Sequence, residues 1–81
     1  MKDKIIQVHV DGGIRVGLVV SVGRKYLGVV WPDSSGMRIN KIPAGPRYKE
    51  LEYPLAKAKQ TLRQCGRNFG ITKSCRRALA A

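Results

Sequence analysis

The sequence predicts an α+β fold, mainly β, in which a small five-stranded antiparallel barrel is followed by two short C-terminal helices. Two observations predict this class. Residues 4–53 contain five short runs in which apolar and polar side chains alternate, separated by turn residues. From residue 54 the apolar side chains recur at spacings of three and four, which is the period of an α-helix. Because the chain has only 81 residues, we expect residues 1–53 and 54–81 to share one core in a single domain.

The alternating runs place strands at 4–10, 14–21, 26–31, 37–42 and 48–53. Asp11-Gly12-Gly13 supplies the residues that a tight hairpin needs between the first two strands. One face of the second strand is expected to consist of Ile14, Val16, Leu18 and Val20. Gly17 falls on the other face, where it allows a bend or a close backbone approach. Closure of such short strands into a barrel would remove exposed sheet edges.

The first helix is expected to begin at Pro54 and to stop at Gly70. Its apolar stripe consists of Leu55, Ala58, Leu62, Cys65 and Phe69. Gly66 lies inside this helix, where glycine costs about 1 kcal/mol relative to alanine, or it splits the helix. Thr72 is expected to cap a second helix at 73–80. The apolar face of that helix consists of Cys75, Ala78 and Leu79.

The charge balance is the most informative feature of the composition. Sixteen Lys and Arg face five Asp and Glu, which gives a net charge of +11. All five acids lie in residues 1–53, where nine basic residues leave +4, whereas residues 54–81 carry seven basic residues and no acid. Such a surface favours an anionic partner, because the charges otherwise repel one another. The alternative is a basic surface that only keeps the protein in solution.

Several classes of function lack the residues that they require. His9 is the only histidine, and with Cys65 and Cys75 it provides too few ligands for a closed zinc site. The two cysteines are expected to be reduced, mostly buried thiols. No paired catalytic groups or phosphate-binding glycine motif occur, so we expect no enzyme, no cofactor and no small-molecule substrate. No long apolar run or cleavable leader is evident, which predicts a soluble cytoplasmic protein that does not bind membranes.

The run RVGLVVSVGRKYLGVV resembles the SH3-like, KOW-type class of small β-barrels, in which a valine-rich strand leads through a Gly-basic turn to a strand containing glycine. The resemblance covers residues 4–53. Members of this class occur in ribosomal proteins, transcription elongation factors and chromatin or phage proteins, and bind nucleic acid or transcription machinery through turns and strand edges. The resemblance implies a binding surface made of Arg24, Lys25, Tyr26 and Trp31. For Trp31 the alternative is a lid on the core.

The C-terminal stretch resembles a helix-turn-helix module over residues 66–79. The matching residues are Phe69, Gly70, Ile71, Thr72, Lys73, Ser74 and Leu79. Arg76 departs from the pattern, because the module has a buried aliphatic residue at that position and an unpaired charge cannot be buried. We therefore favour a helical hairpin that packs on the barrel and presents a basic outer face. A short barrel with a basic helical tail is also similar to small accessory proteins of phages, which act in the host cytoplasm.

The main functional hypothesis is a nonenzymatic module that binds the backbone of DNA or RNA, with a possible role in transcription or its regulation. Its contact residues would be the 24–26 turn with Trp31 and the basic residues of the tail, which are Lys57, Lys59, Arg63, Arg67, Lys73, Arg76 and Arg77. The alternative is a phage-type regulator or inhibitor that binds an acidic site on a host protein of the transcription or defence machinery. A third hypothesis is a structural protein of the ribosome. Exposed aromatic rings beside the cations would favour nucleic acid, and an exposed apolar patch would favour a protein partner.

Overall fold

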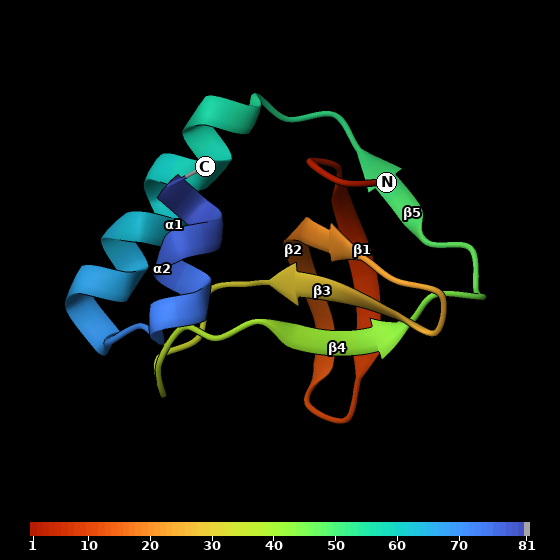
Figure 1. Cartoon of the computed structure of the whole chain (residues 1–81), viewed down its shortest axis with the longest axis horizontal. Coiled ribbons are helices and arrows are strands. Elements are labelled where there is room, and N and C mark those ends of the chain that lie inside the picture. The colour runs from red at the N-terminus through yellow and green to blue at the C-terminus, as the bar shows by residue number, and fades with distance from the viewer. Residues whose placement is uncertain (81) are drawn as a thin grey trace.

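The computed structural model describes residues 1–80, in which five strands precede two helices (Figure 1). The strands are β1 (Ile5–Val10), β2 (Gly13–Val22), β3 (Tyr26–Val30), β4 (Asn40–Pro43) and β5 (Lys49–Leu51). The helices are α1 (Leu55–Phe69) and α2 (Lys73–Ala80). The predicted α+β class, with five strands followed by two helices, is confirmed.

The five strands form one antiparallel sheet in the order β4-β3-β2-β1-β5. The prediction of a closed barrel is wrong, because β4 and β5 are the edges of an open sheet and do not pair with each other. Both edges are short, with four residues in β4 and three in β5. Pro43 ends β4 and Pro46 follows in the connection to β5. Since proline has no N–H to donate, neither residue can extend the ladder that closure would need.

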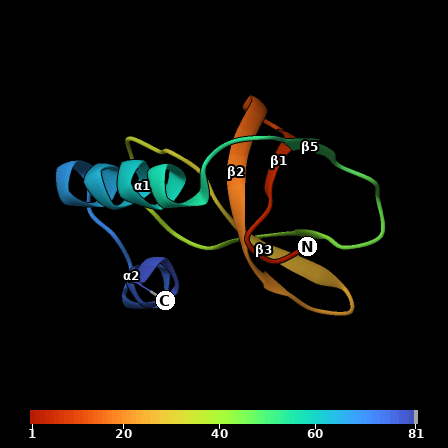
Figure 2. The ribbon, with the colours of Figure 1, turned by 90° about the horizontal axis from the view of Figure 1, so that it is seen from above.

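Apolar side chains are buried on both faces of the sheet. The helix-side cluster joins the strands to the helices, and its buried members are Ile5, Leu18, Val20, Val30, Met37, Leu62, Cys75 and Leu79. The strand cluster lies on the other face, with buried members Ile6, Val8, Val19, Leu27, Val29, Trp31 and Ile42. The two helices lie together on one side of the sheet in both views (Figure 1, Figure 2). The helical region is therefore joined to the sheet by a shared apolar core.

Strand β2 differs from the prediction along its first half. Leu18 and Val20 are buried in the helix-side cluster, as expected, but Ile14 and Val16 are 53% and 45% exposed. Pairing with β3 begins only at Leu18, whereas pairing with β1 continues to Gly13 at the hairpin turn. The hairpin of β1 and β2 therefore extends beyond β3. Ile14 and Val16 lie on the same face as Leu18 but remain about half-exposed.

At Gly17, β2 passes close to the end of β3. A Cβ atom at this position would lie 2.7 Å from the carbonyl oxygen of Val30 and 2.7 Å from Cγ1 of Val29. The predicted close approach of the backbone is confirmed. The hydrogen-bonded ladder between β2 and β3 is also irregular further along β2, where the register shifts between Val19 and Ser21.

Helix α1 is continuous through Gly66, so the glycine does not split it. Gly66 is buried, and a Cβ atom there would lie 3.1 Å from both Cβ and Cδ1 of Ile71. The missing side chain thus lets the residue after the helix fold back against it. Gly70 then stops α1 with a φ of +94°, a conformation that glycine adopts without strain.

The turn between the helices is bonded to the loop between β3 and β4. The Met37 N–H donates to the Gly70 carbonyl at 2.8 Å, and the Thr72 N–H donates to the Met37 carbonyl at 3.1 Å. These bonds pair Met37 with Ile71 in a parallel bridge, and the Met37 side chain is 1% exposed. The fourth strand was expected to begin at residue 37. It begins at Asn40 because the backbone of Met37 bonds to the helical turn instead.

The second helix begins as predicted. The Thr72 side-chain oxygen accepts a hydrogen bond from the Cys75 N–H at 3.2 Å, which caps the first turn of α2. Cys75 and Leu79 are fully buried, and burial raises the pKa of the Cys75 thiol. Arg76 is exposed, so its charge remains in water. Neither helix is long and apolar enough to cross a membrane.

Substitution of Gly17 by alanine is expected to lower the free energy of unfolding by about 1–3 kcal/mol, because the new methyl group meets backbone atoms that cannot move away easily. Gly45→Ala is the matched control, since no atom lies within 4 Å of the added Cβ there. Urea unfolding followed by tryptophan fluorescence measures both. Equal midpoints for the two variants would contradict the close approach of β2 and β3.

Candidate nucleic-acid interface

The helical hairpin presents most of the predicted basic residues on its outer surface. Leu62, Cys75 and Leu79 point into the helix-side cluster, so the opposite faces of α1 and α2 are left to solvent. Figure 2 shows the two helices side by side, apart from the strands. We call the exposed cations of this surface the hairpin face, which consists of Lys57, Arg67, Lys73, Arg76 and Arg77. Each of these five residues is exposed, as the sequence predicted.

The segment that carries the hairpin face contains no negatively charged side chain. Residues 54–81 contain no Asp or Glu, and the acids of the remaining sequence belong to the strands and their connections. Cations that lack neighbouring carboxylates repel each other and condense mobile anions around them. Replacing those anions with the phosphates of a polymer is favourable, because many small ions are then released. The arrangement therefore suits a polyanion.

Arg63 was predicted to belong to the same surface, but its guanidinium has a structural partner. Nη1 of Arg63 donates to the carbonyl oxygen of Leu79 at 3.0 Å. This carbonyl lies in the last turn of α2, where the peptide dipoles place partial negative charge. The bond therefore ties α1 to the end of α2. Lys59 is half-buried and also engaged in an interaction, so these two residues are less available to a ligand than the hairpin face.

The predicted turn of Arg24, Lys25 and Tyr26 lies elsewhere. All three residues are exposed, and the turn is fixed by backbone bonds from Gly23 to Tyr26 and from Ala44 to Lys25, each 2.9 Å long. The connection of β2 to β3 lies at the end of the sheet that points away from both helices (Figure 1, Figure 2). The sequence predicted that both the turn and the tail contact the nucleic acid. The structure separates them into two surfaces.

Trp31 is a correction to the predicted site. Its side chain is 8% exposed and belongs to the strand cluster, next to the chain's turn at Pro32. A ring buried there cannot stack on a nucleobase, so Trp31 is a core residue. The interpretation as a lid on the core, which the sequence left open, is the one that fits. The half-exposed aromatic rings are instead Tyr26, Tyr53 and Phe69.

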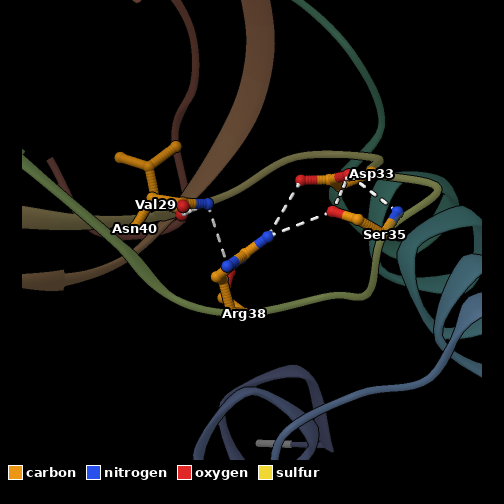
Figure 3. Close-up of polar contacts among 5 residues, drawn as sticks. All are labelled: Val29, Asp33, Ser35, Arg38 and Asn40. Carbon is orange, nitrogen blue, oxygen red and sulfur yellow. Dashed lines mark hydrogen bonds and ion pairs between the residues drawn. The ribbon is translucent and has the colours of Figure 1, made fainter.

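Phe69 and Arg38 form part of a site that the sequence did not predict. Phe69 was assigned to the apolar stripe of α1, but its side chain is 48% exposed where the helix ends. Arg38 lies across from it in the β3–β4 loop, and both line a shallow depression of about 300 Å³. Figure 3 shows Arg38 beside Asp33 and Ser35, with which it interacts. The pairing of these distant segments depends on the Met37 bridge, which no local pattern reveals.

A second, larger depression is apolar. It has a volume of about 470 Å³ and lies between the start of β1, the first half of β2 and α1. Its lining includes Ile5, Val16, Leu18, Tyr53, Ala58 and Leu62. We call it the apolar groove. The exposed pair Ile14 and Val16 extends its surface along β2, where the strand has a neighbour on one side only.

The side chains that could ligate a metal ion do not form a cluster within residues 1–80. Within residues 1–80, no three His, Cys, Asp or Glu side chains lie together in a way that would hold a metal ion. Cys65 is half-buried and Cys75 fully buried, and both are free thiols.

Comparison with protein-family models, curated proteins and solved structures gives no match to this chain. The similarity to SH3-like and helix-turn-helix proteins therefore stays a prediction. Function is inferred from the hairpin face, the depression beside Phe69 and the apolar groove.

Replacement of Arg63 by alanine is expected to reduce the free energy of unfolding by about 1 kcal/mol, because the bond to the Leu79 carbonyl is lost. Lys57→Ala removes the same charge from an exposed position of the same helix, and its effect should stay within about 0.5 kcal/mol. Urea unfolding at moderate salt distinguishes them. A loss for Lys57→Ala as large as that for Arg63→Ala would show that charge, not the hydrogen bond, determines stability.

Proposed function

We propose that the protein is a nonenzymatic module that binds the phosphate backbone of DNA or RNA through the hairpin face. The observation that carries this proposal is the set of five exposed cations on a helical hairpin without acidic residues. A role in transcription or its regulation, in the cytoplasm or in a host cytoplasm if a phage encodes the chain, belongs to the same proposal. The apolar core fixes the positions of both helices, so the backbone that carries the cations does not have to be ordered on binding.

Backbone contacts of this kind have a characteristic dependence on salt. Each phosphate that a cation neutralises contributes about −0.9 to the slope of log affinity against log salt for duplex DNA, and about −0.7 for a single strand. Engagement of the whole hairpin face therefore corresponds to a slope of roughly −3 to −5. The separate 24–26 turn is not needed for this binding. It lies at the other end of the sheet (Figure 1).

Removal of two cations tests the proposal. Arg76→Ala combined with Arg77→Ala is expected to weaken binding to labelled oligonucleotides and to make the salt slope less steep by about 2. The matched control is Lys2→Ala with Lys41→Ala, which removes two exposed charges from the strand region. Fluorescence anisotropy at roughly 50, 100 and 200 mM salt gives both quantities. Equal losses for the two double variants would mean that net charge alone drives association, and no binding by the unmodified protein would refute the proposed function.

A second candidate function is favoured by the apolar groove. We infer that, if the module acts on a protein, its partner is an extended segment with acidic and apolar residues in alternation. Such a segment can add to β2 at Gly13–Gly17, where β3 is absent, and place its apolar side chains in the groove. The net charge of +11 favours an acidic segment and opposes a second copy of this chain. The regulator or inhibitor predicted from the sequence differs in its surface, since it would use the basic residues of the tail against an acidic site on a host protein.

Val16→Glu tests the second candidate because it places a negative charge beside the groove at an exposed position. A labelled peptide with alternating Glu and Val residues should bind the unmodified protein and lose at least tenfold in affinity for Val16→Glu. Val22→Glu is the control, since Val22 is 55% exposed at the other end of the same strand. Equal weakening by both substitutions would indicate a general charge effect and would exclude the groove.

A further inference from the structure

The depression beside Phe69 lies where three segments of the chain meet. The end of α1, the turn before α2 and the β3–β4 loop all contribute to it. The two backbone bonds of Met37 to the helical turn fix these segments relative to one another. The volume of about 300 Å³ is at the lower end of the range of about 300–1,000 Å³ typical of small-molecule sites. It is therefore a preformed depression with room for one planar group.

Phe69 offers an aromatic surface in this depression. It continues the apolar stripe of α1, yet the helix extends past the sheet there and its ring remains 48% exposed. An exposed ring of this size is unfavourable in water, and stacking on another ring would remove it from solvent. The other half-exposed ring with basic neighbours, Tyr26, lies on the far turn.

Arg38 is oriented toward the same depression by its neighbours. Nη2 of Arg38 lies 3.5 Å from Oδ2 of Asp33 and 3.1 Å from the Ser35 hydroxyl oxygen (Figure 3). The Ser35 hydroxyl and N–H in turn donate to Oδ1 of Asp33 at 2.7 and 2.9 Å, and these bonds lower the pKa of Asp33 and keep it ionised. Both contacts of Arg38 use Nη2. The Nη1 and Nε donors therefore remain available to an acceptor on a ligand.

Two members of the hairpin face lie close to Phe69 in the sequence. Arg67 precedes Phe69 by two residues in the last turn of α1, and Lys73 begins α2 on the other side of the turn. Both side chains are exposed. A planar group on Phe69 would thus have cations nearby along the chain in both directions. A nucleotide strand has this chemistry, since each base is followed and preceded by a phosphate.

We propose that this depression binds one nucleobase of a single-stranded nucleic acid. The base stacks on Phe69, its edge accepts hydrogen bonds from Arg38, and the phosphates beside it lie against Arg67 and Lys73. Bases inside a duplex are already stacked and cannot reach the ring, so the site selects single strands. This inference rests on the proposed function, because it assigns a preferred form of nucleic acid to the same hairpin face.

The test compares Phe69→Leu with the unmodified protein on labelled single strands and on a duplex with as many phosphates. Because leucine is apolar but cannot stack, the affinity for single strands should fall by about 5- to 100-fold, while duplex affinity and the salt slope stay unchanged. Phe69→Trp should retain single-strand binding. Tyr53→Leu is the matched control for loss of a half-exposed ring and should leave all nucleic-acid affinities unchanged.

An abasic strand makes the test specific to the base, because it keeps the phosphates and lacks the rings. On that strand Phe69→Leu and the unmodified protein should bind equally. RNA and DNA strands of one sequence are both used, and a loss on either supports the site and identifies the polymer. If Phe69→Leu weakens duplex and abasic binding as much as single-strand binding, or if Tyr53→Leu causes the same loss, the base site is refuted while backbone binding stands. If the unmodified protein binds no strand at all, the proposed function itself has failed.

Discussion

The pairing of Met37 with the helical turn is the constraint on which the rest of the structure depends. Two backbone hydrogen bonds connect a loop of the sheet to the turn between α1 and α2, and the Met37 side chain enters the helix-side cluster at the same point. Met37 is buried, so leaving its N–H and carbonyl unpaired would be costly. The turn can approach this closely because Gly66 has no side chain to meet Ile71. The bridge therefore determines both the position of the helices and the shape of the depression beside Phe69.

Charge and packing are divided between the two faces of the hairpin. The buried face supplies Leu62, Cys75 and Leu79 to the core, and the exposed face carries cations on a segment that contains no Asp or Glu. Self-repulsion among those cations opposes folding, and apolar burial has to offset it. The attraction between the Arg63 guanidinium and the partial negative charge at the end of α2 offsets part of the repulsion that Arg63 itself experiences. A bound polyanion would relieve the remaining repulsion, so the proposed binding would also stabilise the folded protein.

Local patterns in the sequence predicted the helices well and the sheet less well. The spacing of apolar residues, Pro54, Gly70 and the Thr72 cap act within a few residues, and the structure has each of them where the sequence placed it. Closure of the barrel was predicted wrongly because it depends on whether two distant edges meet. The exposure of Ile14 and Phe69 had the same origin, since both follow a correct periodicity to a point where the neighbouring element has ended. Trp31 was assigned to the binding surface and Arg38 was overlooked for the same reason, because only tertiary structure decides which side of a turn is covered.

The two apolar clusters differ in when they can form during synthesis. The strand cluster draws its buried residues from Ile6 to Ile42, so it can assemble once the first half of the chain has been made. The helix-side cluster includes Leu79 and cannot be completed until that residue is available. Leu18, Val20 and Val30 therefore remain uncovered on a partly folded sheet while the helices are being synthesised. During that interval the nascent chain exposes an apolar surface beside open strand edges, which is a substrate that chaperones bind and a surface on which nascent chains can associate.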